Sequence, residues 1–345
     1  MNRPFAFQFS HRQQGLTLIE LLVAMVIGLV IVLAAVASLT VARTGFTAVD
    51  ASSQLRDNGR FASDLIQRIG VQTGYRDVHE AVRLGNQGNS PSPQPASIGG
   101  FNNLLINATD PTIAGSARSS GDVGFGSDVL ILRYQAPQLY TWSSDSTKAT
   151  ISDQSMIDCA GNAVANVVDP TGLAATSNNK IVSIFHVALS QGEPSLMCTY
   201  SPTGAAPWTT VAVIQGVENF QVLFGTDGVV AKTATVATNL PELPDRYLRA
   251  DQIKVDASDI ATQNNWRRVR SIRIGLVLRA ASGTAQGNEN QIFYPFGEAA
   301  ASAGAAAGSA FASASDEGTN FAPSPDTRLR QTVTFSVHLR NDQGL

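Results

Sequence analysis

The sequence predicts an α+β protein in which one long N-terminal helix packs on a mainly antiparallel β-sheet domain with long loops. Two observations predict this class: an apolar N-terminal segment that continues without proline, and a series of alternating apolar segments after residue 127. The 345 residues are 43% apolar and 15% charged, which suffices for a sizeable core. The formal net charge of -3 gives no overall basic surface, so nucleic acid is not an expected partner.

The apolar segment, residues 16–42, is predicted to cross a membrane as the first half of the long helix. Residues 1–15 contain two arginines and no acid, whereas the apolar segment carries Glu20 as its only charge. The part of the segment after Glu20 would rise ~33 Å at ~1.5 Å per residue, enough for a ~30 Å hydrocarbon layer. The basic flank should stay in the cytoplasm, so the rest of the chain should lie across the membrane. A cleaved secretory signal would have a shorter apolar core and a small-residue site after it.

Glu20 separates this segment from a simple membrane anchor. A carboxylate costs on the order of 2.5–3.5 kcal/mol near a bilayer centre, and an anchor gains nothing from it. We therefore expect Glu20 to have a functional partner of opposite charge. The alternative is that its side chain reaches the interface by snorkelling.

The residues from Gly15 to Glu20 (GLTLIE) resemble the cleavage site of type IV prepilins and pseudopilins, in which GFTLxE is cut after the glycine. The resemblance implies that a prepilin peptidase cuts between Gly15 and Leu16 and that Leu16 is N-methylated, although the family usually has phenylalanine there. It also implies the type IV pilin fold. As in the family, we expect Glu20 to accept the terminal amine of a neighbouring subunit, because both charges are costly in apolar surroundings unless they are paired.

The rest of the chain divides into three predicted regions. Residues 43–70 form an amphipathic second half of the helix, residues 71–127 a loop-rich connection, and residues 128–345 a β-rich periplasmic or extracellular domain. The helix stripe expected to pack on the sheet consists of Ala48, Ala51, Leu55, Ala62, Leu65, Ile66 and Ile69. The expected strands are 128–134, 180–189, 195–200, 208–215, 217–224, 268–279, 291–296 and 330–340. Residues 299–315, rich in Ala, Gly and Ser, are expected to form a mobile loop, with a short helix as the alternative.

The two cysteines of the chain, Cys159 and Cys198, are too few for a four-cysteine zinc site or a disulfide-dense scaffold. On the predicted topology both lie across the membrane, in a compartment that favours oxidation. We expect a disulfide between them, which closes a loop of about 40 residues and stabilises the fold by roughly 3–4 kcal/mol. Two buried free thiols are the alternative.

No pattern in the sequence predicts catalysis, a metal or a cofactor. Glycines in residues 120–128 resemble a nucleotide-binding loop, but no P-loop lysine follows and the next segment is an expected strand, so we interpret them as a turn. The four histidines show no metal-ligand spacing to one another or to the cysteines. They are His11, His79, His186 and His338.

The later sequence also resembles the PilW-like minor pilins, in DVLILRY at 128–134, VENFQVLFG at 217–225, WRRVRSIRIGLVLR at 266–279 and the closing RQTVTFSVHLRN. This resemblance implies a minor pilin that helps initiate pilus assembly at the filament tip. Its implied partners are other minor pilins, the major pilin, prepilin peptidase, the inner-membrane assembly platform and a tip adhesin. The sequence leaves open whether the pilus serves cell adhesion, twitching motility, DNA uptake or secretion. The implied location is a single pass through the inner membrane and then the pilus at the cell surface. The alternatives are a J-type minor pseudopilin of type II secretion and an anchored binding module that does not polymerise.

Overall fold

A computed structural model of the chain describes residues 15, 17–76, 95–137, 152–164, 180–235, 243–285, 287, 289–298 and 320–341. The predicted mature first residue Leu16, most of the leader and the insertion at 299–315 lie outside the described residues. The chain divides into two compact units, residues 1–50 and 51–345, and each is described by itself.

Helix α1 (Leu18–Gln72) is continuous, as the sequence predicts, and ends two residues beyond the expected position. In the second unit one stripe of the helix is buried, and it contains most of the predicted positions together with two glycines. The buried residues are Ala51, Leu55, Gly59, Ala62, Ile66, Ile69 and Gly70. The helix ends where Gly74 takes a left-handed φ of 82° and its backbone N–H bonds to Arg133 O at 3.0 Å.

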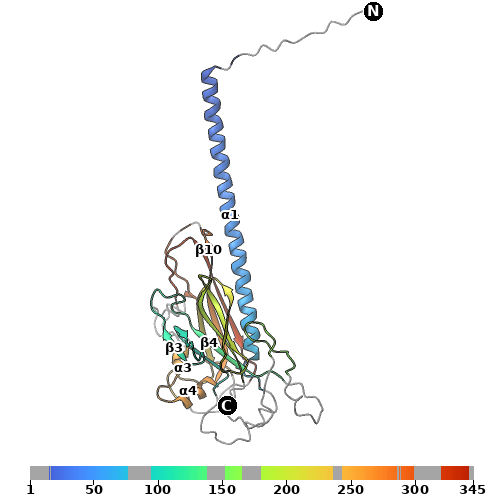
Figure 1. Cartoon of the computed structure of the whole chain (residues 1–345). Coiled ribbons are helices and arrows are strands. Elements are labelled where there is room, and N and C mark those ends of the chain that lie inside the picture. Colours follow the sequence, from blue (N-terminus) through green and yellow to red (C-terminus); the bar gives the residue numbers. More distant parts are fainter. Residues whose placement is uncertain are drawn as a thin grey trace, which may run out of the picture. The chain divides into compact units, whose positions relative to one another are not determined.

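Two antiparallel sheets form most of the second unit (Figure 1). The five-stranded sheet has the order β1-β4-β5-β6-β7, with β1 (Ile98–Phe101), β4 (Val129–Tyr134), β5 (Ile181–Ser190), β6 (Glu193–Ser201) and β7 (Thr209–Gln215). The four-stranded sheet has the order β11-β10-β8-β9, with β11 (Arg328–His338), β10 (Val269–Ser282), β8 (Val217–Thr226) and β9 (Arg246–Leu248). A separate hairpin pairs β2 (Leu104–Ile106) with β3 (Ala114–Ala117), and two short helices are α3 (Ala250–Ile253) and α4 (Asp259–Trp266).

The main core lies where the second half of α1 meets the sheets. Leu276 and Val333 pair across β10 and β11, and the neighbouring Leu278 and Val333 side chains lie against Gly59 of the helix. Residues of α1, β4, β5, β8 and β10 belong to one buried apolar cluster. Alternation along β10 and β11 places one apolar row on the helix side, as the sequence predicts. Strand β11 is half-buried as expected, but β10 is buried on both faces from Ile274 to Leu278, where Pro295 covers Gly275. The predicted α+β class is confirmed.

Most expected strands are present, but two regions differ from the prediction. Residues 291–296 were expected to be a strand; instead Phe293 forms a single bridge to Phe321, and Pro295 lies over Gly275 of β10. This segment therefore covers a sheet face rather than extending the sheet. The predicted connection at 71–127 contains β1, β2 and β3, whose short sequences IGGF, LLI and AGSA have too little apolar alternation to be recognised.

Candidate functional site

The N-terminal end of α1 is built around Thr17 and Glu20. Thr17 N and Thr17 Oγ1 donate to Glu20 Oε2 at 2.9 and 3.0 Å, and Glu20 N donates to Thr17 Oγ1 at 3.3 Å. This reciprocal arrangement is a capping box, in which the threonine precedes the helix and the glutamate is its third residue. This structural role of Glu20 was not predicted, although the T-x-x-E spacing from Thr17 to Glu20 is a signal for it.

The second carboxylate oxygen of Glu20 is left available by this cap. Within the part of the chain that the structure describes, Oε1 accepts no hydrogen bond, because both Thr17 donors use Oε2. Glu20 is exposed, and it shares one face of the helix surface with Ile19, Val23, Ala24 and Ile27. The helix end therefore presents one carboxylate oxygen beside apolar side chains. The structure does not describe the N-terminal amine expected at Leu16, because Leu16 lies outside the described residues.

Among the described residues, α1 is the one helix long and apolar enough to cross a membrane. Its most apolar 18-residue window has a mean hydropathy of 3.0, and none of that window is buried within the chain. The large apolar side chains from Leu18 to Val49 are 53% to 77% exposed. Burial within this chain therefore does not satisfy them, and lipid or other helices must do so.

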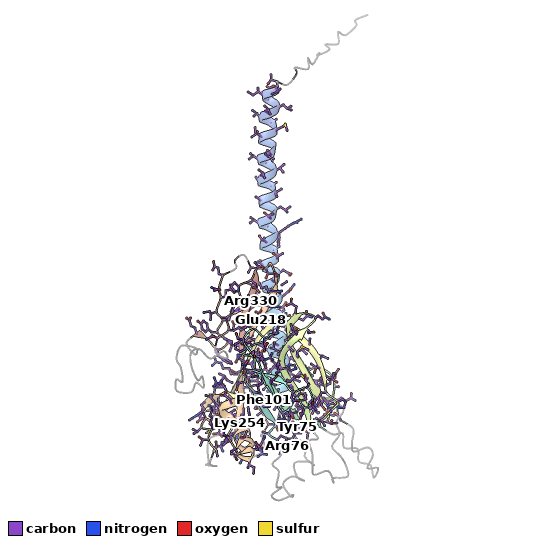
Figure 2. All side chains as sticks on the ribbon, turned by 60° about the vertical axis from the view of Figure 1, so that its left-hand side comes forward. Tyr75, Arg76, Phe101, Glu218, Lys254 and Arg330 are labelled. Atoms are coloured by element: carbon purple, nitrogen blue, oxygen red, sulfur yellow. A yellow bond between two sulfur atoms is a disulfide. The ribbon has the colours of Figure 1, made fainter. Side chains whose placement is uncertain are left out.

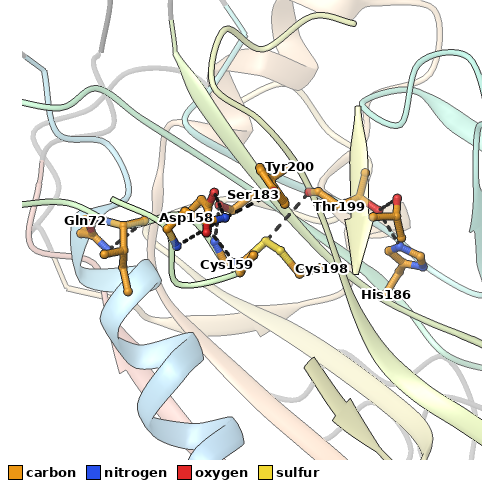
Figure 3. Close-up of a disulfide and its surroundings, with 12 residues drawn as sticks. Gln72, Asp158, Cys159, Ser183, His186, Cys198, Thr199 and Tyr200 are labelled. Atoms are coloured by element: carbon orange, nitrogen blue, oxygen red, sulfur yellow. Dashed lines mark hydrogen bonds between the residues drawn. A yellow bond between two sulfur atoms is a disulfide. The ribbon is translucent and has the colours of Figure 1, made fainter. Parts of the chain in front are cut away.

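A disulfide joins Cys159 to Cys198 of β6, with both cysteines fully buried and their Cα atoms 5.7 Å apart (Figure 3). Cys159 N donates to Ser183 Oγ of β5 at 3.1 Å, and Tyr134 Oη lies 3.0 Å from the same oxygen. The loop that carries Cys159 is thus fixed to the five-stranded sheet by a covalent bond and by hydrogen bonds. This is the pairing that the sequence analysis expects.

The same loop is also bonded to the end of helix α1. Ile157 N donates to Gln72 Oε1 at 2.9 Å, and Gln72 Nε2 donates back to Ile157 O at 3.5 Å. Asn341 Nδ2 donates to Val71 O and Thr73 O at 3.0 and 3.1 Å, so the segment after β11 meets the same helix end. The polar residues at 72 and 341 position the helix end, and sequence periodicity alone does not reveal them.

A cluster of opposite charges connects β6, β8, β10 and β11. Glu218 accepts hydrogen bonds from Arg330 Nε at 2.6 Å and from Arg279 Nη1 at 2.9 Å, and Figure 2 shows Glu218 beside Arg330. Arg279 also bonds Glu193 at 2.7 Å, and Arg330 bonds Asp326 at 2.7 Å. The hydrogen bond from Arg330 is the main cause that lowers the pKa of Asp326. Each arginine therefore already has carboxylate partners, and we interpret this cluster as structural.

The remaining polar candidates from the sequence have structural surroundings. His186 Nε2 lies 2.9 Å from Thr199 Oγ1 inside the five-stranded sheet, and burial lowers its pKa to about 4. Gly121, Gly124 and Gly126 have positive φ angles in consecutive turns before β4, which confirms the predicted turn. Among the described residues there is no group of three or more His, Cys, Asp or Glu side chains arranged to hold a metal ion. His11 and His79 lie outside the described residues.

Comparison with known proteins identifies two regions of the chain. A family model described as type IV pilus-assembly protein W matches residues 184–341, and one described as the prokaryotic N-terminal methylation motif matches residues 10–36. Among solved structures, the chain is similar to the type IV-like pilin TTHA1219 from Thermus thermophilus, with 13% identity and a TM-score of 0.37, over 84% of this chain and 98% of that one. No curated protein matches the sequence. The two family matches coincide with the capped helix end and with strands β5 to β11.

Proposed function

Since the chain belongs to the PilW family of type IV pilus-assembly proteins and carries the prokaryotic N-terminal methylation motif, we propose that it is a minor pilin that helps initiate pilus assembly at the filament tip. Its role is structural rather than catalytic. The chain first spans the inner membrane once, with the N-terminus cytoplasmic and residues after 42 periplasmic, and then enters the pilus at the cell surface. We keep the domain boundaries expected from the sequence. The region 71–127, expected to be a loop-rich connection, contains strands β1, β2 and β3.

The observation that carries the proposal is the geometry of Glu20. One carboxylate oxygen caps the helix through Thr17, and the other accepts no hydrogen bond from the described residues. A helix cap alone does not require a carboxylate in a membrane segment, because glutamine also serves as the acceptor in a capping box. The charge of Glu20 therefore needs a second explanation, and a cation from another subunit provides one.

We propose that this cation is the amine of Leu16 on a neighbouring subunit, formed when prepilin peptidase cuts after Gly15 and then N-methylated. In apolar surroundings an unpaired charge is strongly unfavourable, so the amine and the carboxylate pair when the helix leaves the lipid. Buried ion pairs specify a register more reliably than they add stability. The pair would thus fix the axial position of this subunit against its neighbour.

The proposed partners follow from this route through the membrane. They are prepilin peptidase, the inner-membrane assembly platform, the other minor pilins, the major pilin and a tip adhesin. The exposed apolar half of α1 supplies the surface for neighbouring pilin helices, because its side chains are not covered by this chain. No cofactor is required for this function.

Two measurements test the proposal. Intact mass of the full chain, expressed with and without prepilin peptidase, should show a mature start at Leu16 only when the peptidase is present. In the native host, deletion of the gene should lower the number of pili even when pilus retraction is blocked, because fewer filaments are initiated. An uncut Met1 in both expressions, or unchanged pilus number with retraction blocked, would contradict the proposal.

A further inference from the structure

A cleft of about 460 Å³ lies between strand β1, the β2–β3 hairpin and helices α3 and α4. Its walls are mostly apolar and include Ile98, Phe101, Ile113 and Trp266. In Figure 2, Phe101 and Lys254 mark this region, at the other end of the domain from Glu218 and Arg330. The size is that of a site for a small molecule or a few side chains.

Two glycines in β1 have different roles: Gly100 allows close packing against β4 and Phe224, and Gly99 leaves space beside Arg133. A Cβ atom at Gly100 would lie 2.6 Å from Val129 O, so only glycine fits there without a shift of the backbone. A Cβ atom at Gly99 would meet only one atom within 4 Å, Nη1 of Arg133, at 3.6 Å. The absence of a side chain at Gly99 therefore leaves the Arg133 guanidinium reachable from the cleft.

Arg133 places a positive charge at the floor of this apolar cleft. Its Nη1 donates to Ala96 O at 3.1 Å, and among the described residues its guanidinium makes no other hydrogen bond and no ion pair. Burial lowers the pKa of Arg133 to about 10, and the more distant charge of Asp110 opposes that change. The guanidinium therefore remains cationic at neutral pH, with donors to spare.

The other charged groups around the cleft limit what it can bind. Asp251 pairs with Arg249 at 3.0 Å, and Asp110 Oδ1 accepts from Thr112 Oγ1 at 2.6 Å, so both carboxylates are engaged. Lys254 adds a second cation to the lining, whereas Asp259 adds an acid. One singly charged anion matches this distribution, because a strongly acidic ligand would be repelled by the surrounding carboxylates.

The position of the cleft favours a peptide as the source of that anion. Strand β1 is an edge strand of the five-stranded sheet, so its side away from β4 has no strand partner in the described part of the chain. Such an edge can bind an extended segment through backbone hydrogen bonds while a neighbouring pocket takes a side chain.

We propose that this cleft binds one carboxylate and the apolar side chain beside it, presented by an extended segment of another pilus subunit. Arg133 holds the carboxylate through charge-assisted hydrogen bonds, and Phe101 and Ile113 contact the apolar side chain. The identity of the partner rests on the proposed function, whereas the chemistry of the ligand rests on the cleft alone.

The ligand chemistry is tested by calorimetric titration of the detergent-solubilised full chain with N-acetyl-L-phenylalanine and with its uncharged match, N-acetyl-L-phenylalaninamide. The acid should bind at least tenfold more tightly than the amide. Arg133→Gln should remove that preference, and Gly99→Leu, which fills the cleft and keeps the charge, should weaken binding of the acid at least tenfold. Arg246→Gln, which removes an arginine outside the cleft, should keep the tenfold preference. Equal binding of acid and amide to the unmodified chain, or a preference that survives Arg133→Gln, would overturn the ligand chemistry.

The partner is tested in piliated cells with a photo-cross-linking amino acid in place of Ile113, which is 51% exposed at the cleft. The expected adduct is with a pilus subunit, at a segment in which a carboxylate adjoins an apolar residue, and Gly99→Leu should reduce it at least tenfold. An adduct at another segment, or one that Gly99→Leu leaves unchanged, would overturn the partner assignment. The titration uses the isolated chain, so absence of the chain from pili would overturn the proposed function without changing that result.

Discussion

The two halves of helix α1 have the same secondary structure but opposite environments. Before residue 50 the large apolar side chains are 53% to 77% exposed, whereas the buried stripe after it includes Ile66 and Ile69, which are fully buried. In the first half the apolar residues surround the helix; in the second they form one stripe with polar residues opposite. The second half is therefore stabilised by its own domain, and the first half depends on lipid or on other subunits.

The glycines of the helix show the same contrast. A Cβ atom at Gly28 or Gly45 would have nothing within 4 Å. A Cβ atom at Gly59 would lie 2.7 Å from Val333 Cγ2, and one at Gly70 would lie 2.8 Å from Val337 Cγ1. The glycines of the second half therefore allow β11 to approach the helix closely, whereas those of the first half have no such role within this chain.

The largest expected effect is on the domain that packs the second half. Replacing both cysteines, Cys159→Ala with Cys198→Ala, should lower the free energy of unfolding by about 3–4 kcal/mol, because the unfolded chain is no longer cross-linked. The loop freed by this change is the one that bonds Gln72 at the helix end. Denaturant unfolding of the full chain measures the loss, and membrane insertion should not change. A variant as stable as the oxidised protein would show that the disulfide does not constrain this domain.

A carboxylate introduced into each half of helix α1 tests whether the two halves lie in different environments. Val30→Asp should lower membrane insertion by about 2.5–3.5 kcal/mol, because the side chain lies deep in the predicted span. Gln67→Asp introduces the same carboxylate at an exposed position of the second half and should leave both insertion and stability nearly unchanged. Alkaline extraction of membranes measures the retained fraction. Equal retention of the two variants would contradict the assignment of the first half to the membrane.

The pH dependence of stability reports only on the packed domain. Burial, with the charge of Arg118, lowers the pKa of His186 to about 4 from an unfolded value of 6.5, so the unfolded chain binds the proton more readily. Stability from His186 is therefore present above pH 6.5 and is lost as the pH falls toward 4, by about 2 kcal/mol at pH 5.

A second buried group acts in the opposite direction, so a matched variant is needed. Burial raises the pKa of Asp128 from 3.8 to about 7, so its contribution to stability falls as the pH rises from the unfolded to the folded value. His186→Gln retains a polar partner for Thr199 but does not titrate. The unfolding free energy of the unmodified chain should fall by about 2 kcal/mol relative to this variant between pH 7 and pH 5. Parallel pH profiles would show that His186 titrates normally in the folded state.

The smallest expected effect compares one glycine from each half. Gly59→Ala should destabilise the domain by about 1 kcal/mol, because overpacking against Val333 exceeds the gain in helix propensity. Gly45→Ala should be neutral or slightly stabilising, since only the propensity changes. Thermal unfolding of both variants measures the difference. A stabilised Gly59→Ala would mean that β11 moves easily away from the helix.

The sequence predicted those parts of the fold in which hydropathy has a clear period. Helix α1 and strands such as β10 and β11 show such periods, and their bounds differ from the prediction by only a few residues. Strands β1 and β3 are short and glycine-containing, so their position depends on pairing with distant residues rather than on local pattern. The strand expected at 291–296 failed because its apolar residues pack on the face of β10 instead of joining its edge.

The sequence predicted which residues form the candidate site, but it did not predict how they are arranged and bonded. The motif GLTLIE indicated Glu20, and the cysteine count indicated the disulfide. The different roles of the two carboxylate oxygens of Glu20 depend on three-dimensional positions that no sequence pattern shows. The same is true of the hydrogen bonds between Gln72 and the disulfide loop. Arg133 gave no signal, because its role depends on a glycine of a neighbouring strand that leaves it reachable.

The most direct test of the account is the amount of this chain in sheared, purified pili for the unmodified protein, Glu20→Gln and Thr17→Val. Glu20→Gln keeps an acceptor for the helix cap and removes the charge, whereas Thr17→Val removes the side-chain part of the cap and keeps the charge. If Glu20 pairs with a neighbouring subunit, Glu20→Gln should lower incorporation at least tenfold while Thr17→Val stays within about twofold of the unmodified chain, a difference of roughly 1 kcal/mol. Normal incorporation of Glu20→Gln, or an equal loss in both variants, would contradict the account.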